Sequence, residues 1–176
     1  KSEINDPNAL SVATSSTEGI PSVRMVLLKG LSDKGFVFYT NFNSKKGNDL
    51  KNNPNASMCF HWKSIRRQIR ISGKVSIVEK EEADKYFSSR DYGSKIAAWA
   101  SSQSKTMNTR DEFLKKIKEF EKKFSDKNNV PRPPHWSGWR IIPSEIEFWL
   151  EVENRSHQRL NYRKENGKWI KEILYP

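Results

Sequence analysis

The chain has 176 residues, with 32 Lys and Arg against 21 Asp and Glu, for a formal net charge of +11. This length favours a single domain, and the charge suits nucleic acid, an anionic membrane or a phosphorylated small molecule as partner without choosing among them. A single cysteine, Cys59, excludes an intrachain disulfide, and no apolar run reaches membrane-spanning length, so we expect a cytoplasmic protein with no membrane partner.

Short apolar or β-branched runs separated by turn residues predict strands in the first half, at residues 9–14, 23–29, 36–40 and 57–62. A short helix is predicted over residues 44–52, before Pro54. The clearest alternation follows, because every second residue from Ile69 to Ile77 is apolar or Gly. This pattern predicts a strand with one buried face and one wet or ligand-facing face.

Helical patterns dominate the middle of the chain, at residues 79–90, 94–99 and 110–124. We expect Ser94 to cap the second helix and Thr109 the third, with Glu112 in capping-box position. The third helix is expected to bury Phe113, Ile117, Phe120 and Phe124.

After a proline-rich connector at 131–134, strands are predicted at 139–142, 145–150, 155–163 and 168–174. In a strand, Arg155, His157 and Arg159 would project from one face. Three such groups are costly side by side unless an anion or an aromatic ring lies against them. The plain alternative is a solvated strand face in a basic protein.

The order of these elements indicates an α+β fold, an antiparallel, closed or half-closed β-barrel with peripheral helices, in one domain over residues 1–176. Six Trp, nine Phe and five Tyr accompany a hydrophobic fraction of only 35%. This composition favours a core completed by a partner subunit or by a bound aromatic ligand.

The histidines His61, His135 and His157 lack zinc-ligand spacing, and no glycine-rich phosphate loop occurs, so we expect no metal and a phosphate site built from side chains and helix ends. Ser44-Lys45-Lys46 opens a helix and could seat a phosphate, although a lysine-rich helix start is as plausible. Arg24 and Lys29 fall on opposite faces of a regular strand, which suits two different anions.

Tyr86 and Arg90 lie one helical turn apart, and with Ser94 they could hold another anion. A buried tyrosine beside a surface arginine is the alternative. The amides of Gln68 and Gln103 could bind the edge of a heteroaromatic ring, and Trp149 could cover its face or belong to the core.

Motifs in a fixed order along the chain resemble the pyridoxine (pyridoxamine) 5'-phosphate oxidase family. They are Arg24-Met-Val-Leu-Leu-Lys29, Phe38-Tyr-Thr-Asn41, Ser44-Lys-Lys46, Arg67-Gln68, Tyr86-Phe-Ser-Ser-Arg90, Gln103-Ser104, Glu147-Phe-Trp149 and Arg155-Ser-His157-Gln-Arg159. The resemblance implies an FMN-binding split barrel that forms a homodimer, with flavin sites across the subunit interface.

The resemblance also implies roles for individual residues. The FMN site would comprise Arg24, Met25, Val26, Leu27, Leu28, Lys29, Tyr39, Thr40, Lys45, Lys46, Gln68, Gln103, Ser104, Trp149 and Arg159. The substrate phosphate would be held by Lys29, Tyr86, Arg90 and Ser94, with Arg155 and His157 as catalytic residues beside the pyridine ring.

The implied reaction oxidises pyridoxine or pyridoxamine 5'-phosphate to pyridoxal 5'-phosphate, with O2 as acceptor and H2O2 as product. This sequence departs from the family pattern at Lys45, where Arg is usual, and at Ser156 and Gln158. Three alternatives stay open: an oxidase of another heterocycle, as in phenazine biosynthesis, a flavin-binding protein without oxidase activity, and a basic nucleic-acid-binding module. We expect no nucleic-acid partner, because no recognisable nucleic-acid motif accompanies the charge.

Overall fold

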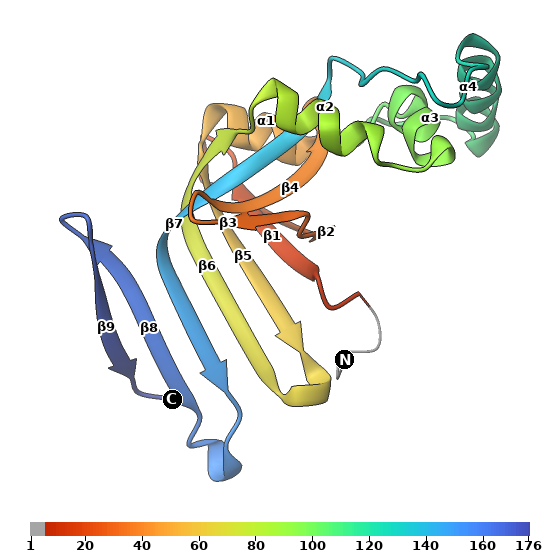
Figure 1. Ribbon diagram of the computed structural model, residues 1–176. Coiled ribbons are helices and arrows are strands. Elements are labelled where there is room, and N and C mark those ends of the chain that lie inside the picture. The colour runs from red at the N-terminus through yellow and green to blue at the C-terminus, as the bar shows by residue number, and fades with distance from the viewer. Residues whose placement is uncertain (1–5) are drawn as a thin grey trace. The chain divides into compact units, whose positions relative to one another are not determined.

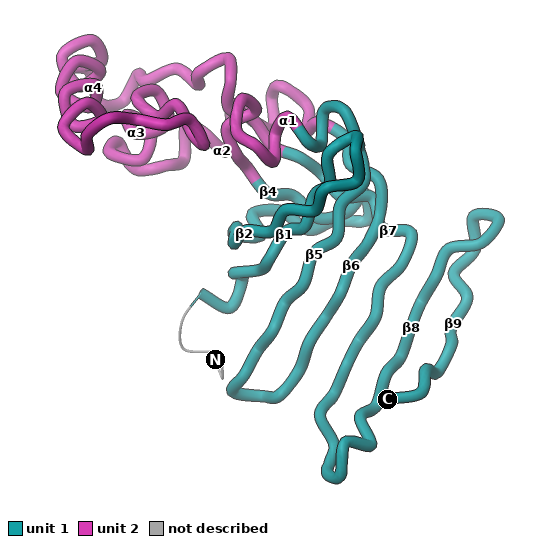
Figure 2. The backbone as a smooth tube through the Cα atoms, turned by 180° about the vertical axis from the view of Figure 1, so that it is seen from behind, with its two compact units in different colours: residues 1–38, 49–76, 139–176 teal, residues 39–48, 77–138 magenta. Residues whose placement is uncertain are grey.

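A computed structural model describes residues 6–176 of the chain (Figure 1). The chain divides into two compact units, shown in Figure 2. We call residues 1–38, 49–76 and 139–176 the sheet unit, and residues 39–48 and 77–138 the helix unit. No helix within the described residues is long and apolar enough to cross a membrane.

The strands form one curled antiparallel sheet, ordered β2-β1-β5-β6-β7-β4-β3, with β8 paired to β7 and β9 to β8. The strands are β1 (Ala9–Ser15), β2 (Pro21–Leu27), β3 (Gly30–Ser32), β4 (Gly35–Asn41), β5 (Asn55–Trp62), β6 (Arg67–Ile77), β7 (Trp136–Leu150), β8 (Gln158–Glu165) and β9 (Lys168–Leu174). This sheet confirms the predicted antiparallel split barrel of an α+β fold.

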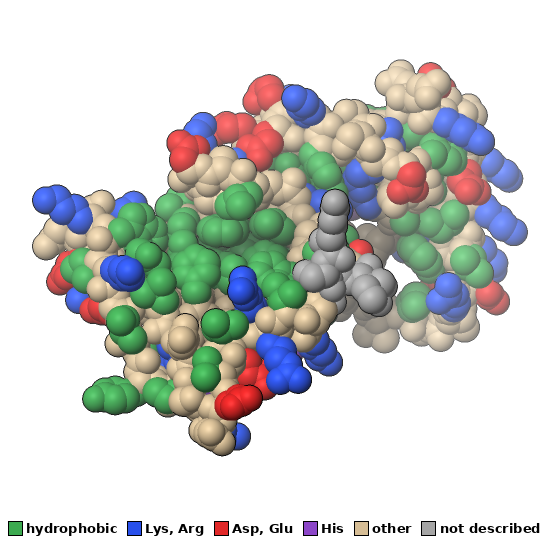
Figure 3. Space-filling model, turned by 60° about the horizontal axis from the view of Figure 1, so that its bottom comes forward, with side chains coloured by type: hydrophobic (Ala, Val, Ile, Leu, Met, Phe, Trp, Pro, Cys, Tyr) green, Lys and Arg blue, Asp and Glu red, His purple; other side chains and the backbone are tan. Residues whose placement is uncertain are grey.

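One face of the sheet is apolar because side chains alternate along each strand. Val12, Met58 and Ile71 are opposite one another on β1, β5 and β6, and all three are buried. The alternation predicted for residues 69–77 is therefore confirmed at Ile71 and Val75, whereas Ile77 at the strand end is exposed. Figure 3 shows hydrophobic side chains gathered over this sheet.

Four helices occur within residues 6–176, namely α1 (Lys45–Asn52), α2 (Lys80–Ser88), α3 (Tyr92–Ala100) and α4 (Arg110–Lys123). The core of the helix unit includes Phe87, Ile96 and Trp136. Three of the four predicted apolar residues of α4 pack against that core while staying half-buried, namely Ile117, Phe120 and Phe124.

One predicted helix cap is wrong, and the other is confirmed in position only. The N-cap of α3 is Asp91, whose Oδ1 accepts a hydrogen bond of 2.8 Å from the backbone N–H of Ser94, so Ser94 lies inside the first turn. Thr109 is the N-cap of α4, as predicted, but its side chain makes no cap hydrogen bond. Glu112 instead accepts a bond of 3.0 Å from Asn108 Nδ2, which replaces the predicted capping box.

Two predicted strand boundaries in the C-terminal part are also wrong. β7 continues through Pro143-Ser144, where a break was predicted, and Ser144 Oγ donates to the carbonyl oxygen of Ser72 on β6 (3.2 Å). β8 begins at Gln158 and not at Arg155. Asn154 and Arg155 have left-handed backbone conformations, with φ of 54° and 59°, which places them in the 3-10 turn η2 (Glu153–Arg155).

Candidate active site

Lys46, Thr40 and Gln103 form a hydrogen-bonded cluster in the helix unit. Lys46 Nζ donates to Thr40 Oγ1 (2.8 Å) and to Gln103 Oε1 (3.2 Å). Lys46 as a whole residue is only 7% exposed, although an ammonium group is normally solvated. The structure thus brings together three of the residues that the resemblance assigns to FMN, from β4, α1 and the loop after α3.

The hydroxyl of Ser44, which we considered as a phosphate ligand, is buried and serves the helix. Its Oγ donates to the carbonyl of Asn41 (2.6 Å) and accepts from the N–H of Gly47 (3.3 Å), as an N-cap does. Lys45 is exposed. Of the two lysines in the Ser44-Lys45-Lys46 motif, Lys46 is therefore the one whose side chain is buried and hydrogen-bonded.

A stack of aromatic rings in the helix unit supports Arg90. The rings of Tyr39 and Tyr86 are stacked with centroids 4.0 Å apart, and Trp136 is stacked 5.2 Å from Tyr39. The guanidinium carbon of Arg90 lies 4.8 Å from the Trp136 ring centroid, a cation–π contact. Trp136 therefore lies next to the predicted pair of Tyr86 and Arg90, although the sequence analysis gave Trp136 no role.

The guanidinium of Arg90 has an unusual environment. Burial lowers its pKa from the ordinary value, and the nearby Tyr86 and Asp91 oppose that shift. Its Nη1 atom is buried and has no hydrogen-bond partner among residues 6–176. A buried cationic donor without an acceptor costs free energy, so the arrangement suits an anionic ligand. The surface-arginine alternative does not describe this side chain.

Four predicted residues of the sheet unit line one cavity of about 680 Å³, namely Gln68, Trp149, His157 and Arg159. The His157 and Trp149 rings have centroids 4.7 Å apart. His157 Nδ1 accepts a hydrogen bond from the backbone N–H of Val152 (3.3 Å). An imidazole that accepts at Nδ1 carries its proton on Nε2, which leaves Nε2 as a donor.

The predicted common strand face of Arg155, His157 and Arg159 is wrong, because both Arg155 and His157 precede β8. Arg155 lies in η2 with a left-handed φ of 59°. Its side chain is exposed and does not line the 680 Å³ cavity. A left-handed φ is uncommon for Arg, and such backbone conformations are common where a loop serves function. Asn154 was the available sign of a turn, because Asn tolerates a left-handed backbone conformation.

The segment from Arg24 to Lys29 is divided by the end of β2. Arg24 donates to Thr14 Oγ1 (2.7 Å) and Ser22 Oγ (2.6 Å), and its Nη2 lies 3.9 Å from the buried Asp49. Burial lowers the pKa of Arg24, and Asp49 opposes that shift. Lys29 lies beyond the strand and is exposed. Met25, Val26, Leu27 and Leu28 also lie outside the 680 Å³ cavity.

Glu147 contacts Arg159, one of the predicted site residues, although the sequence analysis gave Glu147 no role. Its carboxylate accepts two bonds from Arg159, Nε to Oε1 (2.8 Å) and Nη2 to Oε2 (3.0 Å), and it lies 3.3 Å from Arg70 Nη2. Hydrogen bonding from Arg159 lowers the pKa of Glu147, against the effect of burial. The alternation of Glu147 with Trp149 on β7 was the available signal, because both face the same side.

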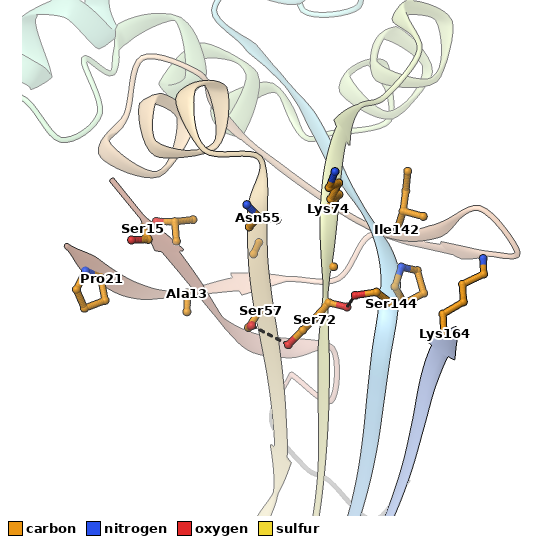
Figure 4. A pocket seen from close by; sticks show the side chains of 14 residues that line it. Ala13, Ser15, Pro21, Asn55, Ser57, Ser72, Lys74, Ile142, Ser144 and Lys164 are labelled. Atoms are coloured by element: carbon orange, nitrogen blue, oxygen red, sulfur yellow. Dashed lines mark hydrogen bonds between the residues drawn. The ribbon is translucent and has the colours of Figure 1, made fainter. Parts of the chain in front are cut away.

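A second cavity, of about 670 Å³, lies over β1, β5, β6 and β7 in the sheet unit (Figure 4). Ser57 and Ser72 face each other there, with their hydroxyl oxygens 2.8 Å apart. Lys74 and Lys164 also line it. None of the predicted site residues does, so this cavity is separate from the candidate site.

Comparison with known proteins gives matches over nearly the whole chain. Residues 1–124 match the family model described as "Pyridoxamine 5'-phosphate oxidase", and residues 136–176 match "Pyridoxine 5'-phosphate oxidase C-terminal dimerisation region". A protein of Pelagibacter ubique named pyridoxine/pyridoxamine 5'-phosphate oxidase is 60% identical, over 100% of this chain and 85% of its own length. A protein of the same name from Agrobacterium fabrum is 51% identical, over 99% of this chain and 85% of its own length.

Solved structures match as well. PhzG from Burkholderia lata, in complex with tetrahydrophenazine-1-carboxylic acid, has a TM-score of 0.92 and 31% identity, over 98% of this chain and 84% of its own. A pyridoxamine 5'-phosphate oxidase-related, FMN-binding protein from Nostoc punctiforme has a TM-score of 0.78 and 16% identity, over 98% and 90%, and shows the shared fold. The chain belongs to the pyridoxamine 5'-phosphate oxidase family of oxidoreductases.

Proposed function

We propose that this chain is an FMN-dependent oxidase that converts pyridoxine or pyridoxamine 5'-phosphate to pyridoxal 5'-phosphate, with O2 as acceptor and H2O2 as product. The observation that supports it most is the buried Nη1 of Arg90, which lacks an acceptor among the described residues. Arg90 lies over the ring of Trp136, on which Tyr39 and Tyr86 are stacked, so a phosphorylated molecule would find a cation and a tyrosine hydroxyl in one region.

The residues present fit FMN as cofactor. A buried ammonium at Lys46 with the Thr40 hydroxyl and the Gln103 amide suits a phosphorylated ligand. The 680 Å³ cavity offers the indole of Trp149 for a ring face and the amide of Gln68 for a ring edge. When bound, FMN supplies the two-electron redox chemistry that no side chain can provide.

The chain's own residues would bind and orient the substrate. Arg90 and Tyr86, with Ser94 at the start of α3, would hold the phosphate. His157, with its proton on Nε2, would donate a hydrogen bond to an acceptor on the substrate, and the exposed Arg155 would cover the pyridine ring. Holding the substrate in a fixed orientation relative to the cofactor would raise the rate of the reaction.

We also propose a homodimer, with each flavin site completed across the subunit interface. The match of residues 136–176 to a dimerisation region supports this, since Trp149, His157 and Arg159 all lie within it. The cytoplasmic location expected from cysteine usage stays a prediction.

The similarity to PhzG supports a second candidate, an oxidase of a partly reduced phenazine. Turnover assays on pyridoxine 5'-phosphate, pyridoxamine 5'-phosphate and a reduced phenazine carboxylate separate the two. We expect oxygen uptake with both B6 phosphates. Uptake with the phenazine alone would assign the chain to the second class, and uptake with none would contradict the proposal.

A further inference from the structure

A carboxylate with two arginines lies beside the 680 Å³ cavity in the sheet unit. Glu147 on β7 has a side chain only 3% exposed, whereas those of Arg159 on β8 and Arg70 on β6 are 26% and 53% exposed. Arg159 lines the cavity, while neither Glu147 nor Arg70 does. The buried carboxylate therefore contacts a cavity residue from outside the cavity.

The contact between Glu147 and Arg159 fixes both the position and the orientation of the guanidinium. Two parallel N–H groups, on Nε and Nη2, donate to the two carboxylate oxygens, a bidentate geometry that defines the guanidinium plane. Nη1 donates to the carbonyl of Tyr175 (2.9 Å). A guanidinium has five N–H groups, so one remains on Nη1 and one on Nη2 for a ligand.

The strand register brings Glu147 and Trp149 to the same side of β7. Trp149 is directly opposite Arg159 on β8, and Glu147 is opposite Asn161. Glu147 thus holds the arginine that adjoins the indole expected against the ligand ring. Arg70 shares Oε2 of Glu147 with Arg159, so the carboxylate also neutralises two cations that would otherwise repel each other.

We propose that Glu147 is a positioning residue that holds the Arg159 guanidinium in the geometry required for binding the flavin cofactor. This inference rests on the proposed function, and specifically on Arg159 being an FMN ligand. Arg70 serves in the same arrangement by binding the other side of the carboxylate.

The test compares FMN dissociation constants, measured by quenching of flavin fluorescence, for the wild type, Glu147→Gln, Arg159→Ala and the double variant. We expect Glu147→Gln to weaken binding roughly tenfold, the size of one charge-assisted hydrogen bond. Because Glu147 acts through Arg159, the double variant should bind FMN as weakly as Arg159→Ala alone. A full additional tenfold loss in the double variant would overturn the inference.

Glu172→Gln is the matched control. Glu172 accepts a bond of 2.8 Å from Nε of Arg163 in the same sheet, but neither residue lines the cavity. We expect FMN affinity within about twofold of the wild type for this control. Equal losses from Glu147→Gln and Glu172→Gln would show a general effect on the sheet and contradict a positioning role.

Arg70→Gln is a second variant that tests the inference if Glu147→Gln does not fold, because Arg70 is half exposed. We expect a loss of about threefold in FMN affinity, and unchanged affinity would count against the arrangement. Failure of the proposed function gives a different result, since a wild type that binds no FMN refutes the cofactor itself. A wild type and a Glu147→Gln variant that bind FMN equally refute only the role of Glu147.

Discussion

The ammonium group of Lys46 lies 2.8 Å from the hydroxyl oxygen of Thr40, and the Lys46 side chain is buried. A lysine side chain loses much conformational freedom when it is held in this way, so its burial needs compensation. The hydrogen bonds to Thr40 and Gln103 compensate part of this cost, and the phosphate of the proposed cofactor would add a charge-assisted contact. Under the proposed function, Lys46 would bind the cofactor, whereas Arg155 is exposed on a turn.

Replacing Lys46 with Ala should lower flavin occupancy more than turnover per bound flavin. We expect the FMN dissociation constant to rise about tenfold, because one charge-assisted contact is lost. Absorbance of bound flavin after gel filtration measures the occupancy. Lys51→Ala is the control, since Lys51 is exposed on the last turn of the same helix, and it should leave occupancy unchanged.

Replacing Arg155 with Ala should lower turnover per bound flavin more than flavin occupancy. Turnover of pyridoxine 5'-phosphate by the flavin-loaded enzyme should fall by at least about tenfold, because the contact over the substrate ring is lost, while FMN affinity changes little. Steady-state oxygen uptake and flavin fluorescence give the two quantities. Equal effects of the Lys46 and Arg155 substitutions on both quantities would refute this division of roles.

Arg90→Gln tests the proposed anion site. Because Arg90 would pair with the substrate phosphate, we expect its loss to raise KM for pyridoxine 5'-phosphate by about tenfold or more, with little change in FMN affinity. Arg110→Gln, at an exposed position at the start of α4, is the control and should leave KM unchanged. An unchanged KM in Arg90→Gln would remove the phosphate-binding role from this residue.

Local patterns predicted most of the strands and helices. The alternation from Ile69 to Ile77 became part of β6, and the strand predicted at residues 168–174 became β9. The turn at Asn154 and Arg155 was missed: Asn adopts left-handed φ values readily, but Arg does not, so the conformation of Arg155 arises from tertiary context. Pro143 was read as a break, yet pairing with neighbouring strands carries β7 through it.

The candidate site was only partly predictable for the same reason. The resemblance supplied Lys46 and Gln103, but the hydrogen bond between them joins residues 57 positions apart, a distance at which no local pattern operates. Glu147 contacts Arg159 because of the register between β7 and β8, and Trp136 stacks on Tyr39. Contacts of this kind depend on the folded structure and cannot be predicted from local sequence patterns.

The sheet should not tolerate a side chain at Gly73. A Cβ there would lie 2.0 Å from the carbonyl oxygen of Ile142 on β7, a backbone atom that cannot rotate away. We expect Gly73→Ala to lower the free energy of unfolding by about 2–3 kcal/mol, measured by urea denaturation. Gly93→Ala is the control, because its Cβ meets nothing closer than 3.4 Å, and it should be neutral or slightly stabilising.

The helix cap at Asp91 makes a pH-dependent contribution to stability. Hydrogen bonds from Ser94 lower the pKa of Asp91 below its ordinary value of 3.8. A carboxylate whose pKa is lowered by folding stabilises the protein fully above the ordinary value, and this contribution is lost as the pH falls through the lowered value. The Tm difference between wild type and Asp91→Ala should therefore be constant near neutral pH and shrink below pH 3.8. A difference that persists unchanged in acid would contradict this origin.

The most direct test of the proposed function is the visible spectrum of the purified protein before and after pyridoxine 5'-phosphate is added without air. We expect the flavin absorbance to be present at the start, to bleach on addition of substrate, and to return when oxygen is admitted. A flavin-loaded protein whose spectrum is unchanged by both B6 phosphates, or a protein that binds no flavin at all, would contradict the account.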